Sequence, residues 1–362
     1  MNLNVNLQSL SVLHAKALLS CLVVVAMVSC GGGGESPAVQ WTVSTFAGSG
    51  QYGSADGTAA TASFANPLSV AVDSTGTVFV ADSFNHKIRK LASDGTVTTL
   101  AGSGSVGSVD DTGSAASFNY PVGIATDARG NIYVTDSGNF KVRKISPAGA
   151  VTTLAGSGNI GSVDSTGAAA SFSNLGGLAL DASGNVYVVD MGNNTIRRIT
   201  QAGVVTTVAG SGAVGASNGP ALSATFFGPF GIAVDSSGTV YVTDLGNSLI
   251  RRLSPAGEVS TFTGSGVSAV ADGTGTAASF AAPEGISIDS LGNMFVVDFG
   301  RIRKITPSGV VSTIVGSIPF GSTDGPGRTA SFNGPSSVAV GAVGRMYIGD
   351  GGNSKIRLVV AQ

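Results

Sequence analysis

Residues 121–156 read PVGIATDARGNIYVTDSGNFKVRKISPAGAVTTLAG, and this stretch decides the fold. A short apolar run ends at Asp127, and Gly130 follows three residues later, which is typical of a type I turn that ends in a left-handed residue. Two further apolar runs and one run with alternating polar and apolar side chains follow, separated by a polar loop and by Pro147-Ala148-Gly149. The predicted strands are residues 123–127, 131–136, 141–145 and 151–156.

The same unit recurs six times along the chain. An arginine in the third strand returns at intervals of 54 residues, with one interval of 52. A phenylalanine ahead of each first strand keeps the same spacing. Chance does not produce such a series, so the chain is built from internal repeats. The two series are Arg89, Arg143, Arg197, Arg251, Arg303 and Arg357, and Phe64, Phe118, Phe172, Phe226, Phe280 and Phe332.

Six units of four antiparallel strands predict an all-β fold, a six-bladed β-propeller with four-stranded antiparallel blades. The last unit stops at Gln362 after its third strand, and residues 39–48 match the sequence of a fourth strand. We therefore expect this N-terminal strand to complete the last blade and to close the ring, which removes open strand edges. The predicted propeller domain spans residues 39–362.

The composition excludes several classes of protein. Charged residues make up 11% of the chain and apolar residues 43%, which excludes disorder caused by high charge and low hydrophobicity. The 54 glycines follow no G-x-y period, which excludes collagen. Acidic and basic residues are interspersed and sum to a net charge of −2. We therefore expect no nucleic-acid partner, and we expect a monomer.

The first thirty residues differ from the rest of the chain. Lys16 precedes an apolar run at residues 17–28, which is shorter than the ~20 residues that span a bilayer and is typical of a secretory signal. Ala26-Met27-Val28-Ser29-Cys30 resembles the lipobox of bacterial lipoproteins, in which the cysteine is acylated, although Met27 stands where that family usually has leucine. The alternative is an ordinary signal peptide. We predict a lipoprotein signal peptide at 1–29, lipidation of Cys30 and a glycine-rich tether at 30–38.

Cysteine content and the residue after Cys30 extend this prediction. Cys21 lies inside the predicted signal, so the mature chain forms no internal disulfide and depends on its core for stability. The predicted location is the cell envelope, with membrane contact through the lipid anchor alone. Gly31 is not the aspartate that favours inner-membrane retention in Gram-negative bacteria. We therefore expect the outer membrane in a Gram-negative cell, and otherwise the extracellular face of the cytoplasmic membrane.

The repeated unit resembles the NHL repeat. The pattern is most complete at Pro229-Phe230-Gly231-Ile232-Ala233-Val234-Asp235, continued by Asp244, Asn247 and Arg251, and the resemblance covers residues 39–362. It implies a six-bladed propeller, and such propellers mostly serve as binding platforms for varied partners. Relatives with this fold also include lactonases with a divalent metal at the ring centre and lyases that use several histidines.

Polar residues that recur in every blade are expected to have a structural role within the blade. Asp82 and Asn85, with their repeats, are predicted to bond nearby backbone groups, and each arginine is predicted to pair with an acid. The fifth unit is two residues shorter between Asp298 and Arg303 and has no asparagine, which predicts a tighter loop. One further position of the repeat, in the loop from the fourth strand to the next blade, holds an acid or an amide in every unit. For this position we predict an Asx-turn in preference to a weak Ca²⁺ site. Its residues are Asp56, Asp110, Asp164, Asn218, Asp272 and Asp324.

The sequence favours a protein that is not an enzyme. The residues predicted to face the ring centre include one carboxylate, Glu284, and His86 is the one histidine outside the predicted signal. One acid and one histidine do not make a divalent site, and a Ser-His-Asp arrangement would also need His86. We therefore predict no catalytic residue, metal or cofactor; the alternative is a lactonase-like hydrolase or lyase at the central channel. The predicted centre-facing residues are Leu68, Val122, Gly176, Phe230, Glu284 and Ser336.

The loops that join fourth to first strands and second to third strands are long and vary between units. Loops on a rigid scaffold are common places for recognition residues. Their variable apolar residues favour a binding module for a protein or polysaccharide; the alternatives are that these residues pack against neighbouring loops or that the chain is a passive envelope scaffold. The predicted ligand-binding residues are Tyr52, Phe84, Phe140, Met191, Phe230, Leu245, Glu284 and Phe299.

Overall fold

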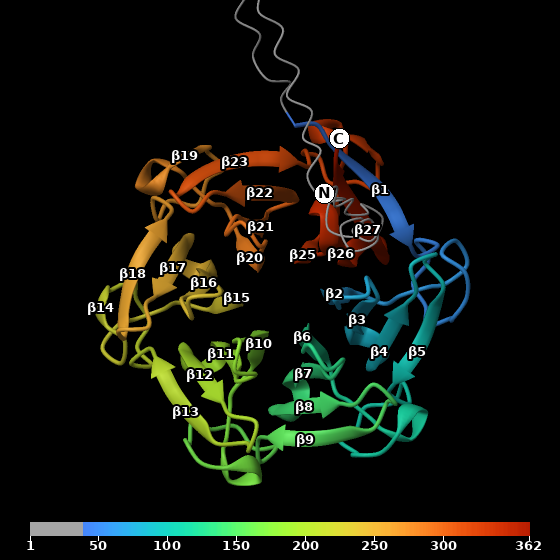
Figure 1. Ribbon diagram of the computed structural model, residues 1–362, viewed down its shortest axis with the longest axis horizontal. Coiled ribbons are helices and arrows are strands. Elements are labelled where there is room, and N and C mark those ends of the chain that lie inside the picture. Colours follow the sequence, from blue (N-terminus) through green and yellow to red (C-terminus); the bar gives the residue numbers. More distant parts are fainter. Residues whose placement is uncertain (1–38) are drawn as a thin grey trace, which may run out of the picture. The chain divides into compact units, whose positions relative to one another are not determined.

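The computed structural model describes residues 39–362 as a six-bladed β-propeller, which confirms the predicted fold class (Figure 1). The predicted signal peptide, Cys30 and the tether lie outside the described residues. The first strand of each blade lies nearest the central axis and the fourth lies at the periphery. Each strand reverses the direction of the one before it, because short turns and loops join neighbours in the sheet.

The strands of the blades are as follows. Blade 1 has β2 (Pro67–Val72), β3 (Val78–Asp82), β4 (Lys87–Leu91) and β5 (Val97–Ala101); blade 2 has β6 (Pro121–Thr126), β7 (Ile132–Asp136), β8 (Lys141–Ile145) and β9 (Val151–Ala155); blade 3 has β10 (Leu175–Leu180), β11 (Val186–Asp190), β12 (Thr195–Ile199) and β13 (Val205–Ala209). Blade 4 has β15 (Pro229–Val234), β16 (Val240–Asp244), β17 (Leu249–Leu253) and β18 (Glu258–Thr263); blade 5 has β20 (Pro283–Ile288), β21 (Met294–Asp298), β22 (Arg301–Ile305) and β23 (Val310–Val315); blade 6 has β25 (Pro335–Val340), β26 (Met346–Asp350), β27 (Lys355–Ala361) and β1 (Trp41–Ala47).

The N-terminal strand β1 lies in blade 6, at the position that the repeat register predicted. It pairs antiparallel with β27, with Trp41 opposite Ala361 and Val43 opposite Val359. Its other edge pairs with the short strand β24 (Gly325–Pro326). The two ends of the described chain therefore share one sheet.

The outer edge of each blade is covered by the loop that leads into it. In blades 4 and 5 the loop forms the two-residue strands β14 (Gly219–Pro220) and β19 (Gly273–Thr274), which pair with the fourth strand. In blade 1 the same position forms a single bridge between Gly57 and Val97. This cover shields the edge that would otherwise be open to pairing with another chain.

The hydrophobic core is divided into six clusters, each between two neighbouring blades. Between blades 1 and 2, for example, Phe79 and Ala81 pack with Ile124 and Val134. The alternation of side chains along each strand places one set against the preceding blade and the other against the next. The blades therefore stabilise one another around the whole ring.

The alternation of turns and loops gives the ring two different faces. The loop rim, as defined here, carries the connections from fourth to first strands and from second to third strands. The turn rim carries the tight connections from first to second strands and from third to fourth strands. At the turn rim Gly76 has a φ of 85° and donates its N–H to the carbonyl of Asp73 at 3.0 Å, as the turn pattern predicted.

Candidate functional site

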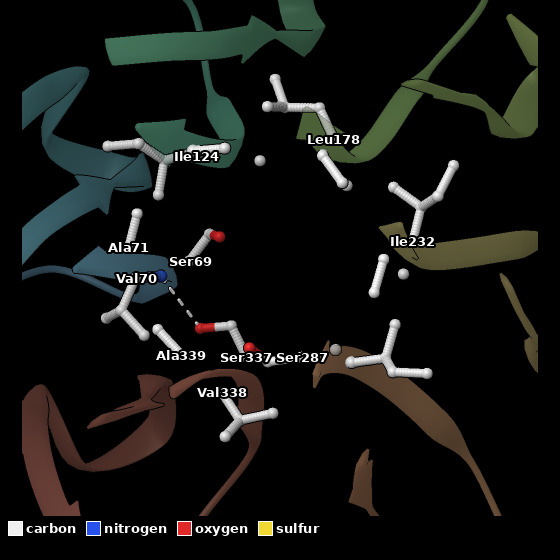
Figure 2. A pocket seen from close by; sticks show the side chains of 18 of the residues that line it. Ser69, Val70, Ala71, Ile124, Leu178, Ile232, Ser287, Ser337, Val338 and Ala339 are labelled. Atoms are coloured by element: carbon white, nitrogen blue, oxygen red, sulfur yellow. Dashed lines mark hydrogen bonds between the residues drawn. The ribbon is translucent and has the colours of Figure 1, made fainter. Parts of the chain in front are cut away.

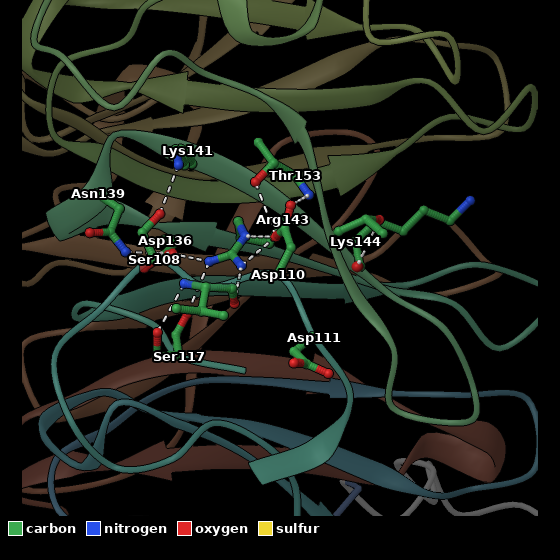
Figure 3. A network of polar contacts seen from close by, with 12 residues as sticks. Ser108, Asp110, Asp111, Ser117, Asp136, Asn139, Lys141, Arg143, Lys144 and Thr153 are labelled. Atoms are coloured by element: carbon green, nitrogen blue, oxygen red, sulfur yellow. Dashed lines mark hydrogen bonds and ion pairs between the residues drawn. The ribbon is translucent and has the colours of Figure 1, made fainter. Parts of the chain in front are cut away.

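A buried ion-pair network under the loop rim holds each blade together, and Figure 3 shows it in blade 2. In blade 2, Arg143 donates from Nη1 to Oδ2 of Asp136 and from Nη2 to Oδ1 of Asp110, both at 2.6 Å. Asn139 donates to the same oxygen of Asp136 at 2.8 Å. The guanidinium also lies 5.1 Å from the ring centre of Phe118. Because Arg143 and Asp136 are fully buried, this ion pair stabilises the blade and does not contact a ligand in solution.

The network recurs around the ring, which confirms the predicted structural role of the repeated Asp, Asn and Arg residues. Burial raises the pKa of Asp136, and the hydrogen bonds from Asn139, from the Asn119 N–H and from Arg143 oppose that rise. Blade 5 lacks the asparagine, and there β21 and β22 are joined by two residues, the tighter loop that was predicted. The buried pairs are Arg89–Asp82, Arg143–Asp136, Arg197–Asp190, Arg251–Asp244, Arg303–Asp298 and Arg357–Asp350.

The Asx-turn predicted for the Asp56 slot is wrong. Oδ1 of Asp56 accepts a hydrogen bond from Nη2 of Arg89 at 2.7 Å, and Oδ2 accepts from the Thr99 N–H at 3.0 Å. The side chain of Asp56 thus connects the loop that leads into the blade to the third and fourth strands of that blade. Asx geometry occurs instead on the turn rim, where Oδ1 of Asp73 accepts from the N–H groups of Thr75 and Thr77, each at 2.9 Å.

The central channel is a cavity of about 360 Å³ lined by both aliphatic and hydroxyl-bearing side chains (Figure 2). Leu68, Val122, Phe230 and Ser336 line it, as predicted, whereas the predicted Gly176 and Glu284 are not among the lining residues. Aliphatic residues two positions further along each first strand also line the channel and were not predicted. The period of two along a strand is the signal that could have found them. These residues are Val70, Ile124, Leu178, Ile232, Ile286 and Val338.

Glu284 is half-buried at the start of β20, next to the channel-lining Gly285. Burial and the nearby charge of Asp298 raise the pKa of Glu284 to about 7. Its backbone carbonyl accepts a hydrogen bond from Oγ1 of Thr243 at 2.7 Å, which joins blades 4 and 5. Among residues 39–362 no three His, Cys, Asp or Glu side chains are grouped so that they could hold a metal ion. The Nδ1 atom of His86 accepts a hydrogen bond from the Tyr120 N–H at 3.0 Å.

The remaining predicted binding residues lie on the loop rim with different degrees of exposure. Tyr52 is 69% exposed, and Phe84 and Phe299 are about half exposed. Phe140, Met191 and Leu245 are half-buried, and Met191 packs against the core between blades 3 and 4. The alternative that these residues pack against neighbouring loops therefore holds for some of them, and it also applies to Phe84, whose ring lies 5.6 Å from that of Tyr120.

Exposed apolar side chains form a repeated set on the loop rim, which we call the rim ring. Each blade connection contributes one member, and in five of the six connections it stands at the equivalent position of the loop. In the connection that leads into blade 5 the equivalent position is Ser268, and the exposed apolar side chain is Val267, one residue earlier. The rim ring consists of Tyr52 (69% exposed), Val106 (64%), Ile160 (70%), Val214 (63%), Val267 (63%) and Phe320 (46%).

Comparison with known protein families identifies the repeat. The NHL repeat family model matches residues 64–91 and 118–145, and the Teneurin NHL domain model matches residues 265–324. The chain therefore contains NHL repeats, and it folds as a six-bladed β-propeller.

Curated relatives share part of their length with this chain. The Arabidopsis thaliana protein SUPPRESSOR OF QUENCHING 1, chloroplastic, is 33% identical over 166 residues, covering 42% of this chain and 16% of the relative. Human NHL repeat-containing protein 2 is 34% identical over 151 residues, covering 38% of this chain and 21% of the relative. The matched region is thus about a fifth or less of the length of these relatives.

Solved structures share the fold over most of the chain. A protein of unknown function from Bacteroides thetaiotaomicron is 25% identical with a TM-score of 0.71, covering 89% of this chain and 76% of that one. An auxiliary nutrient binding protein from the same organism is 17% identical with a TM-score of 0.67, covering 89% and 77%. A gluconolactonase from Xanthomonas campestris is 14% identical with a TM-score of 0.56, covering 83% and 88%. The fold is therefore found in proteins with different activities, and function must be argued from the site.

Proposed function

We propose that this chain is a membrane-anchored, extracytoplasmic binding module that engages a protein or polysaccharide partner through its loop rim. The observation that carries the proposal is the rim ring, six apolar side chains exposed at one face of the propeller. Exposed apolar groups that gather on one face of a soluble domain commonly mark interaction sites. A rigid ring of blades holds the loops in place, so little conformational entropy is lost when a partner binds.

Anchoring rests on the sequence of the N-terminal segment. A lipid chain contributes ~0.8 kcal/mol per buried methylene, so acylation of Cys30 would dominate membrane attachment of this domain. Within residues 39–362 no helix is long and apolar enough to cross a membrane. Replacing Cys30 by alanine should release the protein from membranes without changing its thermal unfolding. Recovery of the variant in the membrane pellet after a high-salt wash would contradict the anchor and the envelope location that follows from it.

The binding role is tested by removing apolar side chains from the loop rim. Tyr52→Ser, Ile160→Ser and Val214→Ser, combined, should weaken binding to envelope preparations of the native cell at least tenfold, because their contact area with the partner is lost. The matched control is Leu291→Ser with Val343→Ser, two turn-rim residues that are 78% and 96% exposed. Equal binding by both variants would overturn the loop rim as the binding face.

The second candidate function is a lactonase-like hydrolase or lyase that acts at the central channel. The observation that favours it is Glu284, whose raised pKa near 7 suits a general acid or base. We propose that the chain is not an enzyme, because the channel is lined by apolar and hydroxyl-bearing side chains and no group of three His, Cys, Asp or Glu side chains that could hold a metal occurs among residues 39–362. Lactone hydrolysis or lyase activity that is lost in Glu284→Gln would overturn this, as would a melting temperature that falls with EDTA.

A further inference from the structure

The six repeats allow each blade to be compared with the other five, and several departures lie in blade 5. The loop between β21 and β22 is the short one, and Glu284 is the one carboxylate that opens a first strand. The residue that opens β22 is Arg301, where the other blades have lysine, threonine or leucine. The loop that leaves blade 5 carries Arg328, where the other five loops have Ala60, Ser114, Ala168, Leu222 and Thr276. Residues that are not required by the blade structure common to all six repeats are candidates for a specific function.

Arg301 and Arg328 line one hollow of about 440 Å³ on blade 5, under the loop rim. Asp272 and Thr313 form its polar wall, and Val270 and Ile318 form apolar parts of it. Two arginines in one hollow are notable in a chain with 19 lysines and arginines in all. Their positions make the hollow a candidate anion site.

The two guanidinium groups make few hydrogen bonds to other described residues of the protein. Nη2 of Arg328 donates to Oδ2 of Asp272 at 3.2 Å and to the Thr313 carbonyl at 3.4 Å, and Nη1 of Arg301 donates to the Phe299 carbonyl at 3.4 Å. Each guanidinium has five N–H donors, so most of their donors remain open among residues 39–362. The Arg328 side chain is 65% exposed, so a ligand can reach it.

The carboxylate of Asp272 does not neutralise the hollow, because it is already shared. Nη2 of the buried Arg303 lies 3.1 Å from Oδ1 of Asp272, and the N–H and hydroxyl of Thr313 donate to the same oxygen at 2.9 and 2.8 Å. These bonds lower the pKa of Asp272 against the effect of burial. Asp272 and the buried Asp298, which pairs with Arg303 at 2.6 Å, are thus two carboxylates against the three charges of Arg303, Arg328 and Arg301, which leaves an excess of one positive charge.

An aromatic pair lies close in sequence to two residues that line the hollow, Arg301 and Ile318. The rings of Phe299 and Phe320 lie 5.2 Å apart in an edge-to-face arrangement, and each side chain is 46% exposed. Phe299 lies two residues before Arg301, and Phe320 lies two residues after Ile318. Partly exposed aromatic rings near a cationic hollow suit a ligand that combines a flat apolar face with an anionic group.

We propose that the blade 5 hollow binds a carboxylated sugar unit of an acidic polysaccharide. The carboxylate accepts hydrogen bonds from Arg301 and Arg328, and the apolar face of the sugar ring lies against Phe299 and Phe320. A guanidinium fork matches carboxylate geometry, which gives selectivity for acidic over neutral sugars. This inference rests on the proposed binding function and names its ligand class.

The test is calorimetric titration of the purified protein with oligogalacturonate. The matched reference ligand is the methyl-esterified oligomer, which keeps the sugar rings and removes the charge. The protein should bind the acidic oligomer at least tenfold more tightly, and affinity should fall as salt concentration rises. Arg301→Gln with Arg328→Gln should weaken binding at least tenfold, whereas Arg129→Gln with Arg345→Gln, which removes the same charge from exposed turn-rim positions, should change it less than twofold.

Several results would overturn the proposal. These are the absence of binding, equal affinity for the esterified oligomer, or an equal loss in the two arginine variants. A glutamate-rich peptide that binds as tightly as the acidic sugar would show that the hollow selects charge and not a sugar. Envelope binding that depends on the rim ring but is unchanged in Arg301→Gln with Arg328→Gln would reject this ligand class and leave the proposed function standing.

Discussion

Arg251 in blade 4 donates from Nη2 to the amide oxygen of Asn218 at 2.9 Å, whereas the five other blades offer a carboxylate at this slot. The difference reaches the outer strand as well. In blade 3, Oδ2 of Asp164 accepts a hydrogen bond from the Thr207 N–H at 2.8 Å. The amide nitrogen of Asn218 cannot accept the equivalent bond from Thr261. Blade 4 is therefore held with one fewer carboxylate than its neighbours.

We expect Asn218→Asp to stabilise the protein. The new carboxylate would pair with Arg251 and accept the Thr261 N–H, for a gain of about 0.5–1.5 kcal/mol in the free energy of unfolding at a half-exposed position. Asp164→Asn is the reverse change in blade 3 and should cost a similar amount. Urea unfolding of both variants measures the effect, and a loss of stability in Asn218→Asp would contradict it.

The inner carboxylate of each network should matter more than the outer one. Asp136→Ala leaves the buried Arg143 with the half-exposed Asp110 alone, and breaking a buried pair costs about 3–5 kcal/mol. Asp110→Ala removes the outer partner, which is 44% exposed, and should cost about 1 kcal/mol. Denaturant unfolding distinguishes the two, and similar losses would mean that burial does not set the energetics of this network.

Glu284 should make stability depend on pH. Its pKa is raised from 4.5 to about 7 in the folded state, so the folded state holds the proton more tightly than the unfolded state does. The free energy of unfolding should then fall as the pH rises from about 4.5 to about 7, and remain lower above that range.

Glu284→Gln removes this dependence and serves as its test. The variant should equal the wild-type protein near pH 4.5 and exceed its stability at pH 8 by an amount of the order of 3 kcal/mol. Glu258→Gln, at an exposed carboxylate of β18, is the control and should track the wild type at every pH. A constant difference between Glu284→Gln and wild type from pH 4.5 to pH 8 would show that the carboxyl is not the titrating group.

The fold was predictable from the sequence because repetition gives the same signal six times. The 54-residue interval locates the strands. The match of residues 39–48 to a fourth strand locates the seam, which is the pairing of the N-terminal strand β1 with the C-terminal strand β27. The roles of Asp82 and Arg89 followed from their presence in every blade. A residue that recurs in all six blades has a role in the structure that the six blades have in common.

The functional candidates were harder to predict because they depend on how loops pack in three dimensions. Nothing in the sequence near Asp56 shows that its partner is Arg89, 33 residues later. Arg301 and Arg328 are far enough apart along the chain that their shared hollow appears only when the loops are placed. Exposure of Phe84 and partial burial of Met191 likewise depend on neighbours contributed by other segments.

The last prediction concerns the seam of the ring. Within β1, Val43 is fully buried between blades 5 and 6, Trp41 packs edge-to-face on Phe295 at 6.0 Å, and Phe46 packs on Tyr347 at 5.0 Å. Val39, which precedes β1 in the segment that matches a fourth strand, is 61% exposed. Burying large apolar side chains contributes on the order of 1.5–3 kcal/mol each, and a typical domain is stable by only ~5–15 kcal/mol.

Removing residues 39–48 should therefore destabilise the whole ring and expose the edge of β27 to pairing with other chains. The measurement is thermal unfolding with light scattering on proteins that begin at residue 30, 39 or 49. The first two should melt together, and the third should melt several degrees lower and associate. The control is deletion of an equal length of loop on the loop rim, which should cost less because fewer apolar side chains are lost. If the protein that begins at residue 49 stays monomeric and melts within about two degrees of the others, β1 does not hold the ring closed.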